Sequence, residues 1–203
     1  MKFTIALAAL AAALITAPAA QAAVVRYAAV LTGAAEAPPN ASPGTGFAVI
    51  DYDDVSHVMH IEASFSGLLG LTSASHIHCC TAAPNTGTAG VATTTPSFPG
   101  FPLGVTAGRF INDFDLDFAT SFNPAFVTAS GGSLVTARDR LVAGFNAGTT
   151  YFNIHTGPNP ANASPGFGGG EIRGFIQVPE PSNLALMALS LAALGATSRR
   201  KSA

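Results

Sequence analysis

The 203-residue sequence predicts a mainly β fold: a single antiparallel β-sandwich or barrel-like domain with two short helices, flanked by an N-terminal signal helix and a C-terminal hydrophobic helix. Three features of residues 23–178 lead to this prediction. Short segments in which apolar and polar side chains alternate recur along this part of the chain, as in half-buried strands. Stretches rich in glycine and proline separate these segments. Helix-capping signals stand out in one region, between residues 123 and 148.

Strands are expected wherever this alternation occurs. The side chains of a strand point alternately to the two faces of its sheet, so each such segment can bury one face. Residues 47–52 and 57–65 are close enough in the chain to form a hairpin through Asp53 and Asp54. In chain order, the expected strands are 24–31, 47–52, 57–65, 73–80, 90–95, 106–118, 151–156 and 171–176.

Two short helices are expected between the strands. Asn123 can cap the first helix, with Pro124 at its first position and the glycines 131–132 at its end. Ser133 can cap the second helix, and Gly148 can end it. Because strands precede and follow these helices, the domain is expected to remain mainly β.

The first 22 residues have the features of a secretory signal peptide. With 48% hydrophobic and 10% charged residues, the chain is unusually apolar for a soluble protein, and its two ends account for much of this. Lys2 gives a positive start, residues 5–17 form an apolar run, and residues 20–22 form an A-x-A cleavage site. The exported chain is therefore expected to begin at Ala23.

Residues 179–203 contain a short motif, an apolar run at 184–196 and a basic tail. The motif is Pro179, Glu180 and Pro181, and the tail contains Arg199, Arg200 and Lys201. This order resembles the PEP-CTERM sorting signal. The resemblance implies recognition by an exosortase-type membrane enzyme, transient anchoring in the inner membrane, and delivery to the cell surface or extracellular matrix of a Gram-negative-type bacterium. As a transmembrane helix the run is short, because thirteen helical residues cover only about 20 Å of a hydrocarbon core of about 30 Å.

The charge balance of residues 23–178 argues against a nucleic-acid partner. This span has five arginines, no lysine and ten acidic residues. A nucleic-acid-binding protein needs a basic stripe, which this composition does not provide. The sequence also has neither a G-x-S-x-G nor an H-E-x-x-H motif, so no enzyme activity is expected.

The segment SASHIHCC at 73–80 concentrates metal-ligating side chains. On a strand, His76, His78 and Cys80 would share one face, and His155 lies on a second expected strand. One hypothesis is a copper or zinc site formed by His76, His78 and His155, with Cys80 or a water molecule as fourth ligand. The alternative is that these outward-facing histidines only form hydrogen bonds across strands, beside a surface ion pair of Glu171 and Arg173.

Cys79 and Cys80 allow several states. Two cysteines in an exported protein usually form one disulfide. Neighbouring Cα atoms across a trans peptide lie about 3.8 Å apart, below the usual disulfide range of about 4.4–6.8 Å, so a bridge between adjacent cysteines needs strain. Free thiols, a cross-link to another chain and a thiolate at a metal site are the alternatives.

Several motifs together resemble the CHRD domain over nearly all of residues 24–178. They are LTGAAEAPP at 31–39, a strand at 46–50, SHIH at 75–78, YFNIHT at 151–156 and GGEIRGFI at 169–176. The chain departs from the commoner A-H-I-H-G of that family, because Ser75 precedes His76 and the two cysteines follow His78.

The resemblance implies an all-β extracellular module without a general enzymatic activity. The protein is thus expected to be an exported cell-surface or matrix protein that acts by binding or structural assembly with a surface or matrix component. The alternative function is that of an extracellular copper or zinc protein, including a redox-active one, using His76, His78 and His155.

Overall fold

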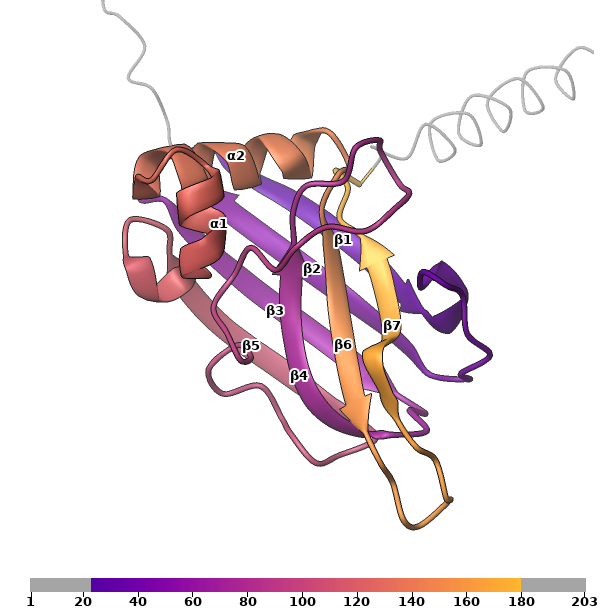
Figure 1. Cartoon of the computed structure of the whole chain (residues 1–203). Coiled ribbons are helices and arrows are strands. Elements are labelled where there is room, and N and C mark those ends of the chain that lie inside the picture. Colours follow the sequence, from indigo (N-terminus) through magenta and orange to yellow (C-terminus); the bar gives the residue numbers. More distant parts are fainter. Residues whose placement is uncertain (1–22, 180–203) are drawn as a thin grey trace, which may run out of the picture.

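The computed structural model describes residues 23–179 (Figure 1). Seven antiparallel strands form one curled sheet in the order β4-β6-β7-β1-β2-β3-β5, accompanied by two α-helices. The predicted mainly β fold with two helices is confirmed. The predicted signal peptide, Glu180 and Pro181 of the sorting motif, the apolar run and the basic tail lie outside the described residues. Within residues 23–179, no helix has the length and apolar character needed to cross a bilayer.

The elements follow the predicted order with small shifts at their ends. The strands are β1 (Val24–Thr32), β2 (Thr45–Asp53), β3 (Val58–Ser66), β4 (Leu71–His78), β5 (Gly108–Asp115), β6 (Tyr151–Gly157) and β7 (Phe167–Phe175). The α-helices are α1 (Pro124–Ala129) and α2 (Leu134–Asn146), and short 3-10 turns occupy Gly33–Ala35 and Ala119–Ser121. The predicted caps are present, because Asn123 accepts from the amide of Ala125 and Ser133 from that of Thr136.

The apolar core fills the inner face of the curled sheet. Its fully buried side chains include Tyr27, Leu31, Ile50, Ile61, Ile77, Phe152, Ile154 and Ile172. One end of the sheet is covered by α2, where the ring of Phe145 lies 5.1 Å from that of Tyr27 (Figure 1). Phe98 lies between the two edges of the sheet. Its ring centroid is 5.8 Å from that of Phe152 on β6 and 5.6 Å from that of Phe110 on β5. It therefore links strands that do not pair with each other.

The connection between β4 and β5, residues 79–107, runs along the free edge of β4. Backbone hydrogen bonds join them, from Ala92 N to Ile77 O (2.9 Å), from Phe98 N to Ser75 O (3.1 Å) and from Gly104 N to Thr72 O (2.8 Å). The predicted strand at 90–95 is reduced to isolated bridges at Val91 and Thr93. The connection thus protects an edge that would otherwise expose unpaired backbone groups.

Two groups of strands meet where β7 pairs with β1. Thr32 of β1 lies opposite Arg173 of β7, and Ala28 forms a bridge with Gln177 in the same register. Gly174 allows this close approach, because a Cβ atom there would lie 2.1 Å from the carbonyl oxygen of Val30. The strands that carry the histidines, β4 and β6, are attached to the rest of the sheet through this contact.

Candidate metal centre

Three histidines meet on the outer face of β4 and β6. His76 and His78 are on β4, and their side chains lie opposite Asn153 and Tyr151 of β6. His155 of β6 lies opposite Ala74, on the same face. The structure brings the three predicted histidines together, with one ligand atom from each lying within 4.8 Å of the others. The two histidines of β4 are buried, however, because residues 86–97 fold over them instead of leaving them on an open surface.

Backbone carbonyl groups fix the tautomer of each histidine. His76 donates from Nε2 to the oxygen of Pro96 (2.6 Å), and His78 donates from Nδ1 to the oxygen of Ala89 (2.9 Å). His155 donates from Nδ1 to the oxygen of Gly168 (3.0 Å). Since a carbonyl oxygen can only accept, each of these ring nitrogens carries the proton. The other nitrogen of each uncharged ring therefore presents a lone pair.

The three lone-pair nitrogens are buried and unsatisfied. They are His76 Nδ1, His78 Nε2 and His155 Nε2, and none of them has a hydrogen-bond partner among residues 23–179. Buried polar atoms are nearly always paired, and an unpaired one costs about 1–3 kcal/mol. Three acceptors that face one another cannot satisfy each other, so this space suits a cation.

Burial keeps the rings uncharged. It lowers the pKa of His76, His78 and His155, and it lowers that of His78 to about 4. Metal ligation requires neutral imidazole. The cluster is therefore in its ligating form at neutral pH, without a proton that a metal ion would have to displace.

Tyr151 is a supporting residue of the site that the sequence did not reveal. Its ring stacks on that of His78 at 4.7 Å with an interplanar angle of 8°. Its hydroxyl donates to the carbonyl oxygen of Ala89, the same atom that accepts from His78. The guanidinium of Arg173 lies 4.6 Å from the Tyr151 ring. Tyr151 and His155 are four residues apart on one strand, so alternation puts them on the same face, but no sequence signal indicates that Ala89 or Pro96 lies there.

The prediction that Cys80 supplies a fourth ligand is wrong. Cys80 forms a disulfide with Cys79, and the peptide bond between them is cis. Both sulfur atoms lie against α2, near the carbonyl oxygen of Arg140 and the Cα of Gly144. The reason is that β4 ends at His78, so the alternation that placed Cys80 beside the histidines does not extend to it.

The prediction of a surface ion pair between Glu171 and Arg173 is also wrong. Both side chains are buried, at 0% and 4% exposure. Arg173 donates from Nε to the oxygen of Ala35 and lies 3.8 Å from a carboxylate oxygen of Glu36. Glu171 accepts from four donors, which are Ser42 Oγ, Leu69 N, Gly70 N and Thr156 Oγ1. Residues 33–44 and the β3–β4 turn cover this face, where the sequence suggested solvent.

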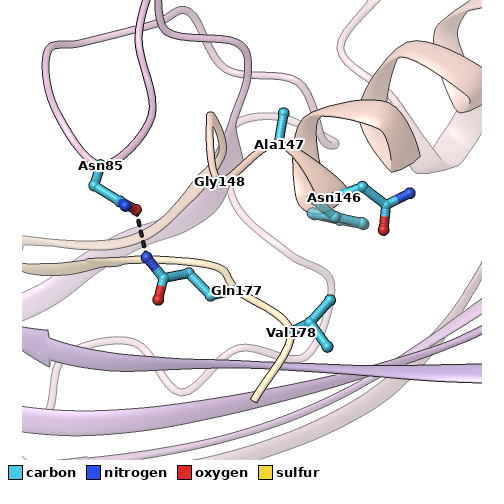
Figure 2. A pocket seen from close by; sticks show the side chains of 7 residues that line it. Asn85, Asn146, Ala147, Gly148, Gln177 and Val178 are labelled. Atoms are coloured by element: carbon cyan, nitrogen blue, oxygen red, sulfur yellow. Dashed lines mark hydrogen bonds between the residues drawn. The ribbon is translucent and has the colours of Figure 1, made fainter. Parts of the chain in front are cut away.

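A separate pocket lies where the described chain ends. Figure 2 shows Gln177 donating a hydrogen bond to Asn85 there, next to Asn146, Ala147, Gly148 and Val178. Phe145 completes the lining. None of these side chains titrates or is a usual metal ligand, so the pocket offers no chemistry comparable to that of the histidines.

Comparison with known proteins gives one family. Residues 27–176 match the CHRD domain, which is most of the chain and includes all three histidines. No curated protein and no solved structure matches the sequence. The chain therefore belongs to the CHRD domain family.

Proposed function

We propose that the protein binds one copper or zinc ion through His76 Nδ1, His78 Nε2 and His155 Nε2. One observation carries the proposal: three buried imidazole nitrogens face one another, and each is left with a lone pair because its ring partner donates to a backbone carbonyl. The hydrogen-bonding alternative accounts for only one nitrogen of each ring. A metal ion would satisfy all three of the others.

The donor set suits these metals. Imidazole is a common ligand of zinc and copper, and ligating histidines usually donate their second ring nitrogen to a carbonyl or carboxylate group. The ligand atoms lie within 4.8 Å of one another. In a tetrahedral site with Zn–N bonds of about 2.0–2.1 Å the nitrogens would be about 3.3 Å apart. Small rotations of the side chains would therefore complete the geometry.

Metal analysis tests this proposal. The purified protein, equilibrated with zinc or copper and then dialysed, is expected to retain one equivalent of metal by elemental analysis. The double variant His76→Ala/His78→Ala should retain none, and calorimetry should show an affinity lowered about 100-fold or more, because only one protein ligand remains.

His60→Ala provides the matched control. His60 is a partly exposed histidine that pairs with Asp113, and its strand, β3, is remote from β4 and β6 in the sheet order. This variant should bind metal as the wild type does. The proposal fails if the wild-type protein holds no stoichiometric metal, or if His60→Ala lowers the affinity as much as the double variant.

We further propose that the protein is exported and acts at the cell surface or in the extracellular matrix, by binding or structural assembly and not as an enzyme. The features of residues 1–22, the resemblance of residues 179–203 to a PEP-CTERM signal and membership of the CHRD family support this role. The proposed partners are an exosortase-type sorting enzyme and a surface or matrix component.

Replacing Pro179, Glu180 and Pro181 by alanine tests the sorting step. The variant is expected to remain unprocessed in the inner membrane, because the sorting enzyme would no longer recognise it. Immunoblots of membrane and medium fractions would show the larger form in the membrane. Alanine replacement of the neighbouring Ser182 and Asn183 is the control and should be processed normally. If the motif variant reached the medium at its normal size, the assignment of residues 179–203 as a sorting signal would be refuted.

A further inference from the structure

We propose that the trihistidine centre keeps one coordination position open and that this position accepts a small anion from solution. This inference rests on the proposed metal binding. It adds the chemical class of the exogenous ligand, which would be an anion of a few atoms, such as azide, cyanide or hydroxide.

The protein supplies three ligands and no fourth. Among the described residues, the group of histidine, cysteine and acidic side chains around the site consists of His76, His78 and His155 alone. Cys80, two residues beyond the end of β4, is held in a disulfide against α2. Structural zinc sites use four protein ligands, whereas sites with three keep a position for water or another small molecule. A metal ion held here would therefore have a vacant position.

A buried positive charge, that of Arg173, lies one aromatic ring away from His78. Tyr151 lies between His78 and Arg173, with its ring 4.7 Å from the His78 ring and 4.6 Å from the guanidinium carbon. In a buried environment, a positive charge one aromatic ring away from a metal ligand favours binding of an anion over that of a neutral ligand.

The acidic neighbour of Arg173 neutralises it only in part. Glu36 lies 3.8 Å from Arg173 Nε, and burial raises the pKa of Glu36 to about 7. Near neutral pH a substantial fraction of this carboxyl group is therefore uncharged. The other buried acidic group of this face, Glu171, is held by four hydrogen-bond donors of its own, so Arg173 is the buried charge left to balance a bound anion.

A polar side chain lies between Arg173 and the histidines. Asn153 is opposite His76 in one strand pair and opposite Arg173 in the next. It is 2% exposed, and its amide oxygen has no hydrogen-bond partner within residues 23–179. Its amide nitrogen donates a long hydrogen bond to the oxygen of Gly169 (3.5 Å), which rotation of the amide would give up in order to present an N–H donor in place of the oxygen. His155 is the least buried of the three ligands, so a small anion would enter on its side.

Cobalt(II) spectroscopy tests the open position. Co²⁺ reports its coordination through visible absorption bands, and the Co²⁺-loaded protein is titrated with azide and, separately, with neutral imidazole. We expect a saturable spectral change with azide and a weaker response to imidazole. An azide-insensitive spectrum would overturn this inference while leaving metal binding intact. Failure to bind Co²⁺ at all would instead count against the proposed function and remove the basis of the inference.

Variants of Arg173 test the source of the anion preference. Arg173→Gln should weaken azide binding about tenfold because a buried positive charge is lost, and Arg173→Lys should largely restore it. If Arg173→Gln and Arg173→Lys bind azide with equal affinity, the charge of Arg173 is not the source of the anion preference. Because Arg173 is buried, folding of each variant is checked by circular dichroism. If Arg173→Gln does not fold, the comparison of azide with imidazole on the wild-type protein decides the question.

Discussion

Glu171→Gln is expected to lower the free energy of unfolding by about 3 kcal/mol. The carboxylate is fully buried and accepts hydrogen bonds from two backbone amides, those of Leu69 and Gly70, one at each oxygen. A glutamine has a single oxygen, so its NH₂ group must face one of these N–H donors. The hydroxyls of Ser42 and Thr156 can reverse their roles, whereas a backbone amide cannot.

Urea unfolding followed by circular dichroism measures this effect. Glu62→Gln is the matched control, because Glu62 is a strand residue whose salt bridge to Arg109 is about half exposed. Exposed pairs contribute about 0–1 kcal/mol, so the control should unfold close to the wild-type midpoint. If both variants unfold alike, the buried hydrogen bonds of Glu171 do not stabilise the β3–β4 turn as described.

Gly174→Ala is expected to destabilise the protein by about 3 kcal/mol, and to loosen the contact between β7 and β1. The added methyl group would lie 2.1 Å from the carbonyl oxygen and 2.8 Å from the carbonyl carbon of Val30. These are backbone atoms, so neither can move without separating the two strands. Thermal unfolding and amide hydrogen exchange at β1 and β7 would detect the change.

Gly169→Ala, in the same strand, separates the clash from the general effect of adding a side chain. Nothing lies within 4 Å of a Cβ atom at Gly169, which is exposed. Its unfolding free energy should change by no more than about 0.5 kcal/mol. A similar loss in both variants would mean that the close approach of Val30 is not what requires glycine at 174.

The period of a strand made the histidine cluster predictable in part. His76 and His78 are two residues apart, so alternation alone placed them on one face, opposite Ile77. That β4 and β6 are neighbours could not be read from the chain, because the pairing joins segments more than seventy residues apart. The helix-capping signals also gave correct predictions, because Asn123 and Ser133 cap the two helices as expected.

The errors have two physical origins. Sequence alternation shows which face of a strand a side chain occupies, but not whether another segment covers that face. Glu171 and Arg173 were assigned to solvent for this reason, although residues 33–44 lie over them. The prediction for Cys80 is wrong because β4 ends at His78, two residues before the predicted end of this strand. Irregular segments rich in proline and glycine give no periodic signal of where they pack.

The covering segment between β4 and β5 orients two of the imidazoles through main-chain oxygen atoms alone, those of Ala89 and Pro96. A carbonyl group is the same in every amino acid. Substitutions at these two positions that preserve the backbone path should therefore leave the rings oriented, whereas a deletion that shifts the path by one residue would disorient them. Selection on this loop would then act on its length and course more than on its side chains.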